Sequence, residues 1–231
     1  MTTFNISIVS DTVCPWCFVG KQRLDKAIAK WTKTHPDDVI NTTWMPFYLN
    51  ADAPKAGIDK QEYYQSRFGP ERAKMMQARL ATIGQADGIA FKFGGRTGNT
   101  RDSHRLVQLG KTKGPAVQTR VVEELFKAYF EQEQDITSHD VLLAAGVRAG
   151  LDEAEVKDWL ASDKGGKQVD EEVEDAQSRL ISGVPNFTVD DRFQLEGAQD
   201  PEAFVQVFEA VVASKGIKDG PAGKSITADR C

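Results

Sequence analysis

Cys14-Pro15-Trp16-Cys17 is the stretch that decides the fold, because it lies where a short apolar strand gives way to a helix. Residues 5–10 are Asn-Ile-Ser-Ile-Val-Ser, and this alternating, β-branched pattern predicts a strand. After the motif, apolar side chains recur at helical spacing as far as Trp31. Pro15 suits the first helical position, where a missing backbone N–H costs little. We therefore expect Cys14 at the start of a helix and Cys17 one turn further on.

A cysteine pair at such a junction favours thiol–disulfide exchange. Free N–H groups and the positive end of the helix dipole stabilise an anion at the first turn of a helix. A thiolate at Cys14 is such an anion, so Cys14 is the predicted nucleophile, with Cys17 within disulfide reach. A purely structural pair of buried cysteines is an alternative, but it does not explain the embedded proline.

A zinc site is a second alternative for the cysteine pair. It would need two further ligands, and the chain offers only three histidines and one more cysteine: His35, His104, His139 and Cys231. Because none of these forms a second ligand pair, we expect no metal.

Composition limits the partners and the compartment. The chain has 231 residues, 40% of them hydrophobic, which is enough for one large domain or for a domain with an insertion. The net charge of −5 without a Lys/Arg run argues against nucleic acid, and no apolar run approaches the ~20 residues of a membrane span. The first predicted strand begins within a few residues of the N-terminus, so we expect no secretory signal and a cytoplasmic protein whose cysteines cycle.

The pattern along the chain predicts one α/β unit built from both ends. Val39 to Leu49 predicts a second strand, and a hairpin of 186–189 with 192–195 precedes a helix that starts at Asp200-Pro201. Between them, periodic apolar residues predict helices at 59–68, 70–84, 99–113, 115–129, 138–149, 152–161 and 164–181. The predicted division is 1–56 with 182–214, a helical insertion at 57–181, and a flexible tail at 215–231.

Three segments and one dipeptide resemble a known family: 11–20, 44–50, 99–106 and Val184-Pro185. They are similar to the DsbA-like thioredoxin superfamily, in its FrnE-like branch, which is related to 2-hydroxychromene-2-carboxylate isomerases and kappa-class glutathione transferases. The resemblance implies a thioredoxin fold, βαβ…ββα, interrupted by an all-helical insertion domain, and a disulfide oxidoreductase activity. It also implies that the Pro185 peptide bond is cis and faces the cysteines.

Two features depart from these relatives. Periplasmic DsbA proteins carry a histidine inside the motif, where this chain has Trp16. The isomerases and kappa transferases usually lack the cysteine pair and act through bound glutathione, whereas this chain keeps both cysteines.

The predicted site combines the motif with residues that the resemblance brings near it. The catalytic residues are Cys14, Cys17 and Pro185, and the substrate-binding residues are Pro15, Trp16, Val184, His104 and Asn99. The resemblance implies that His104 borders the cleft, where it could shuttle a proton, although a structural role in its helix is the alternative. Asn99 has a helix cap as its alternative role.

The leading functional hypothesis is a thiol–disulfide oxidoreductase, or disulfide isomerase, that acts on protein or glutathione-linked disulfides. The alternative is a glutathione-dependent isomerase or transferase of small molecules, and a third is a binding protein with an apolar helical surface. No tightly bound cofactor is expected, but glutathione fits as reductant or co-substrate. The sequence leaves open whether the protein forms a homodimer. Cys231 is expected to be an exposed tail thiol.

Overall fold

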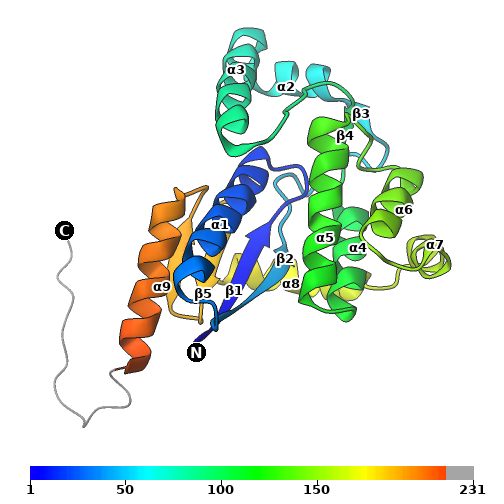
Figure 1. Cartoon of the computed structure of the whole chain (residues 1–231). Helices are drawn as coiled ribbons and strands as arrows, with labels where there is room; N and C mark the ends of the chain where they lie inside the picture. The colour runs from blue at the N-terminus through cyan, green and yellow to red at the C-terminus, as the bar shows by residue number, and fades with distance from the viewer. Residues whose placement is uncertain (217–231) are drawn as a thin grey trace.

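The computed structural model describes residues 1–216, and its centre is a four-stranded mixed sheet (Figure 1). The strands are β1 (Thr3–Ser10), β2 (Val39–Pro46), β5 (Asn186–Val189) and β6 (Phe193–Glu196), in the order β2-β1-β5-β6. Strands β1 and β2 are parallel, and the other two pairings are antiparallel. The sheet therefore joins both ends of the chain, as the sequence predicts.

Two helices pack side by side against this sheet, α1 (Pro15–Thr34) and α9 (Pro201–Gly216) (Figure 1). Their contact is aromatic: Phe4 of β1 lies 5.1 Å from Phe208 of α9 and 5.8 Å from Trp31 of α1, measured between ring centroids. All three side chains are buried, so strand β1 and both helices share one core.

The segment between β2 and β5 is mainly helical. Its elements are β3 (Ile58–Asp59), α2 (Lys60–Phe68), α3 (Pro70–Asp87), β4 (Arg96–Thr97), α4 (Arg101–Thr112), α5 (Pro115–Phe126), the π-helix η1 (Lys127–Glu131), α6 (His139–Arg148), α7 (Glu153–Ala161) and α8 (Gly166–Ser178). Helices α4, α5 and α8 pack against β2. The α2–α3 pair contacts α1 instead and lies over its N-terminal end (Figure 1).

The insertion departs from the predicted all-helical pattern at one point. Strands β3 and β4 form a two-residue antiparallel ladder, Ile58 with Thr97 and Asp59 with Arg96. Two residues are too few to show an alternating pattern, so this ladder could not be predicted from the sequence. Helix α8 also ends earlier than predicted, at Ser178, and Leu180 after it has a φ of +60°.

The C-terminal boundary also differs from the predicted one. Lys215 belongs to helix α9 and not to a tail, while Cys231 lies outside the described residues. Within residues 1–216, no helix combines the length and apolar character that crossing a membrane requires.

Candidate active site

Cys14 lies at the N-cap of α1, as predicted. Its backbone is extended, with φ −88° and ψ 112°, and Pro15 occupies the first helical position. The Cys14 carbonyl accepts a hydrogen bond from the Cys17 N–H at 3.1 Å, and the Cys14 N–H donates to the Asp11 carbonyl at 3.1 Å. No acidic side chain occupies the first turn, so the helix terminus is free to stabilise a thiolate.

The two thiols are free, and both are buried, with 3% of Cys14 and 1% of Cys17 exposed. The exposed fraction therefore does not distinguish the two thiols. Their position relative to a neighbouring cavity, described below, does, because Cys14 lines this cavity and Cys17 does not. Burial raises the pKa of Cys17 well above its ordinary value, and the neighbouring Cys14 adds to the effect. Hydrogen bonds from Ser10 and the Asp11 backbone act in the opposite direction without reversing it. Cys17 is thus a protonated thiol at neutral pH.

The loop before β5 lies against the first cysteine. The Val184–Pro185 peptide bond is cis, and the Cys14 thiol donates to the Val184 carbonyl at 3.6 Å. Pro185 packs against α1 at Gly20, where a Cβ would lie only 3.0 Å from Pro185 Cγ and 3.1 Å from Phe187 Cζ. A glycine at position 20 therefore permits the close approach of this loop to the active-site helix.

Cys14 opens onto a cavity of about 290 Å³. Pro15, Trp16 and Val184 line it beside Cys14, and the α2–α3 pair and the 91–93 segment form its other walls. The lining is largely apolar, and its aromatic members besides Trp16 are Tyr63, Tyr64, Phe68, Phe91, Phe93 and Phe130. The cavity thus gives the thiol a confined apolar surrounding, which suits a small ligand or an extended segment.

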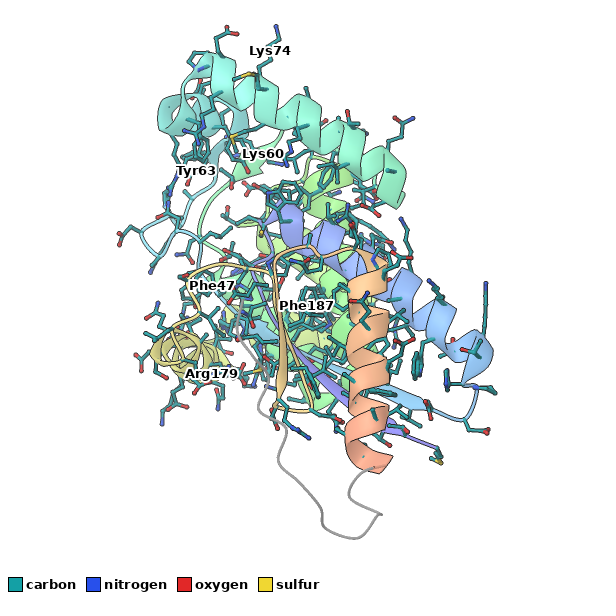
Figure 2. All side chains as sticks on the ribbon, turned by 90° about the vertical axis from the view of Figure 1, so that its left-hand side faces the viewer. Phe47, Lys60, Tyr63, Lys74, Arg179 and Phe187 are labelled. Carbon is teal, nitrogen blue, oxygen red and sulfur yellow. The ribbon has the colours of Figure 1, made fainter. Side chains whose placement is uncertain are left out.

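Lys60, which the sequence analysis did not single out, also lines this cavity. It is 2% exposed, its Nζ donates to the Tyr129 carbonyl at 3.0 Å, and Nζ lies 3.6 Å from the centroid of the Tyr129 ring. Burial lowers the pKa of Lys60 to about 8, while Glu133 acts in the opposite direction. In Figure 2, Lys60 and Tyr63 lie on the side of the α2–α3 pair that faces the rest of the molecule.

His104 and Asn99 do not line the cavity. His104 is buried, and its Nε2 lies 3.1 Å from the Phe47 carbonyl and 3.3 Å from Asp11 Oδ1. Asp11 Oδ2 in turn accepts the Leu49 N–H at 2.8 Å. His104 and Asp11 therefore connect the segment that follows β2, at Phe47 and Leu49, to the segment that precedes Cys14.

Asn99 supports the start of α4 from the position before the N-cap, which is Thr100. Its Oδ1 accepts the Arg101 N–H at 3.0 Å, which is close to the alternative, helix-capping role considered for it. In the described part of the chain, no three His, Cys, Asp or Glu side chains gather as a metal site would require.

Comparisons with known proteins agree with the fold. A family model described as a DSBA-like thioredoxin domain matches residues 5–209. The uncharacterized protein YwbO of Bacillus subtilis (strain 168) is 27% identical over 210 residues, which cover 87% of this chain and 94% of YwbO. The crystal structure of the probable DsbA oxidoreductase SCO1869 from Streptomyces coelicolor superposes with a TM-score of 0.80 at 27% identity, covering 99% of this chain and 96% of that one.

A second similar structure is that of the cytosolic disulfide reductase DsbM from Pseudomonas aeruginosa with GSH. It superposes with a TM-score of 0.58 at 15% identity and covers 90% of this chain and 99% of DsbM. At that identity, the likeness is one of fold.

Proposed function

Because the chain belongs to the DsbA-like thioredoxin family, we propose that it is a thiol–disulfide oxidoreductase whose reacting pair is Cys14 and Cys17. One observation carries the proposal: Cys14 caps the active-site helix and faces a cavity, while Cys17 lies one turn behind it. A nucleophilic thiol in front and a resolving thiol behind it are the two parts that disulfide exchange needs.

The proposed reaction has two exchanges. The Cys14 thiolate attacks one sulfur of the substrate disulfide; the Cys14–substrate S–S bond forms, the substrate S–S bond breaks, and the departing thiolate takes a proton. Cys17 then loses its proton and attacks Cys14 Sγ, which releases the second substrate thiol. The substrate is reduced by two electrons, and the protein pair is left as a disulfide. Two molecules of an external thiol, such as glutathione, return the pair to the reduced state.

The surroundings of Cys14 support particular roles in these steps. The helix N-terminus stabilises the attacking thiolate, and Trp16 offers an apolar face beside it. The Val184 carbonyl, which accepts a hydrogen bond from the Cys14 thiol, becomes available to an N–H of an extended substrate once the mixed disulfide forms.

The burial of Cys14 favours small or extended substrates. Only 3% of the residue is exposed, and its open side faces the cavity, so a disulfide has to enter the cavity to react. A disulfide fixed on the surface of a folded protein would not reach it. Low-molecular-weight disulfides, glutathione-linked disulfides and unfolded peptide segments are the proposed substrate classes. DsbM, described as cytosolic and solved with GSH, supports glutathione as a partner and a cytoplasmic setting.

A comparison of two activities tests the proposal. Reduction of a small disulfide with glutathione as the electron donor should be measured for the wild type, Cys14→Ser and Cys17→Ser, beside conjugation of glutathione to an electrophile. We expect disulfide turnover in the wild type and its loss in both variants. Conjugation that saturates with glutathione and survives Cys17→Ser, without disulfide turnover, would instead establish the glutathione-dependent isomerase or transferase class.

A further inference from the structure

The charge of the cavity is opposite to the charge of the chain. The whole protein has a net charge of −5, yet three cationic side chains line the cavity, Lys60, Arg67 and Lys92, and one carboxylate, that of Asp11. The Asp11 carboxylate is 1% exposed and already accepts the Leu49 N–H. It is therefore not positioned as the partner of the three cations.

Lys60 differs from the other deeply buried lysine of the described chain, Lys21. Lys21 is 5% exposed, and two carboxylates neutralise it: Asp25, with Nζ to Oδ2 at 2.5 Å, and Glu123. Lys60 is 2% exposed, and no carboxylate oxygen of residues 1–216 lies within 4.0 Å of its Nζ. Its polar contacts are one carbonyl and the face of one aromatic ring, both from Tyr129.

An ammonium group in this position has spare hydrogen-bonding capacity. Three N–H bonds are available on Nζ, and one is used on the Tyr129 carbonyl. The Tyr129 hydroxyl donates to Thr97 Oγ1 at 2.8 Å, so it is not directed to Lys60. Glu133 favours the Lys60 cation only from beyond ion-pair distance and does not outweigh the cost of burial, since the pKa of Lys60 is still lowered. An anionic ligand that enters the cavity would offset more of that cost.

We propose that Lys60 makes this cavity selective for carboxylate-bearing low-molecular-weight disulfides and thiols, with the ligand carboxylate on Lys60 Nζ and the ligand sulfur at Cys14. This inference rests on the proposed oxidoreductase function, since it names the substrate class of the same site. The cavity volume of about 290 Å³ is at the lower end of small-molecule sites, which span roughly 300–1,000 Å³. The aromatic lining would contact the carbon chain between the two groups.

A series of three disulfides of similar length tests the charge selectivity. They are 3,3′-dithiodipropionate, with two carboxylates; bis(2-hydroxyethyl) disulfide, which is neutral; and cystamine, with two ammonium groups. We expect the wild type to show the highest kcat/KM for dithiodipropionate and the lowest for cystamine. In Lys60→Met, kcat/KM for dithiodipropionate should fall about tenfold or more, as for loss of a charged hydrogen bond, while that for the neutral disulfide changes by less than about twofold.

Two further variants make the comparison specific. Lys74→Met removes the same charge from the exposed side of α3, away from the cavity lining (Figure 2), and should leave all three values unchanged. Lys60→Arg keeps the charge and should retain the preference for dithiodipropionate. An equal loss on all three disulfides in Lys60→Met, or a wild type that does not discriminate by charge, would overturn the proposal.

A binding measurement separates this inference from the oxidoreductase function. In the Cys14→Ser, Cys17→Ser double variant, 3-mercaptopropionate binding can be followed by tryptophan fluorescence, since Trp16 lines the cavity. We expect saturable binding that Lys60→Met abolishes and Lys74→Met leaves intact. Turnover of the neutral disulfide that depends on Cys14, together with no Lys60-dependent binding, would refute the charge selectivity and leave the proposed function standing. The reverse result would refute the function and keep the site.

Discussion

Cys14 and Cys17 are equally hidden from solvent but differ in what they face. Cys14 lines the cavity at the helix N-terminus, whereas burial raises the pKa of Cys17 and keeps it a thiol. We therefore predict that limiting iodoacetamide at pH 7 labels Cys14 before Cys17 in the reduced protein. Peptide mass mapping against time measures this order. Faster labelling of Cys17 would reverse the assignment of nucleophile and resolving thiol.

Lys60 should give the cavity a pH-dependent preference. Burial lowers its pKa to about 8, so the side chain is cationic below that pH and becomes neutral above it. Burial raises the pKa of Tyr64 to about 12 and that of Tyr129 well above its ordinary value, so these neighbours stay neutral in the same window. The ratio of kcat/KM for dithiodipropionate to that for the neutral disulfide should therefore fall as pH rises from 7 to 9.

The ratio is the quantity to measure, because ionisation of the attacking thiol affects both disulfides and cancels. In Lys60→Met the ratio should be low and independent of pH. A wild-type ratio that stays constant as pH rises through 8 would contradict an interaction between the ligand carboxylate and the charged Lys60 side chain.

The sequence predicted Cys14 but not Lys60, and the difference is physical. Cys14 acts through local structure, since the helix start and Pro15 lie next to it in the chain. Lys60 follows the helix cap Asp59, where a lysine normally lies in solvent. Only the packing of η1 against α2 brings the Tyr129 carbonyl and ring to its Nζ, and no local pattern encodes that contact.

At the level of elements, the end of α3 is tied to α1 by one buried carboxylate. Asp87 accepts from Arg23 Nε at 2.8 Å and from Lys26 Nζ at 2.6 Å. Burial acts to raise the pKa of Asp87, but the hydrogen bonds from Lys26 and Arg23 outweigh it, and the pKa is lowered. This contact anchors the α2–α3 pair that forms one wall of the cavity.

Replacing this carboxylate should weaken the packing of the α2–α3 pair against α1. We predict that Asp87→Asn lowers the free energy of unfolding at pH 7 by about 2 kcal/mol, the order of a charged hydrogen bond. Because the folded-state pKa is lowered, the stabilisation is complete above the unfolded-state pKa and is lost as pH falls through the folded-state value. Denaturant unfolding of both proteins at pH 7 and at pH 3 measures the difference. An equal gap between the two proteins at both pH values would argue against the ionic contact.

Helix starts were predictable from the sequence because capping is local. Pro15, Pro70, Pro115 and Pro201 each open a helix, and the Asp59 side chain accepts the Glu62 N–H at 2.9 Å. The β3–β4 ladder was not predictable, since it pairs segments that are distant in the chain. The π-helical turn η1 directly continues α5, and the spacing of its apolar residues does not distinguish it from an α-helix.

At the scale of the whole molecule, the site is assembled from segments that are distant in the chain. The motif comes from the start of α1, Val184 from the loop before β5, and the opposite wall from α2 and α3. The sequence and its family resemblance named Cys14, Pro15, Trp16 and Val184, which the structure brings together around the cavity. They also named His104 and Asn99, which lie outside its lining: His104 contacts the carbonyl of Phe47, just after β2, and Asn99 accepts an N–H at the start of α4.

The central claim is that Cys14 forms the mixed disulfide and Cys17 resolves it. The most direct measurement is to mix reduced Cys17→Ser with excess dithiodipropionate or oxidised glutathione, and then to locate the adduct by intact mass and peptide mapping. We predict one substrate half on Cys14, stable in the absence of added thiol, and no persistent adduct in the wild type. An adduct confined to Cys231, or equal adduct formation in Cys14→Ser, would contradict the account.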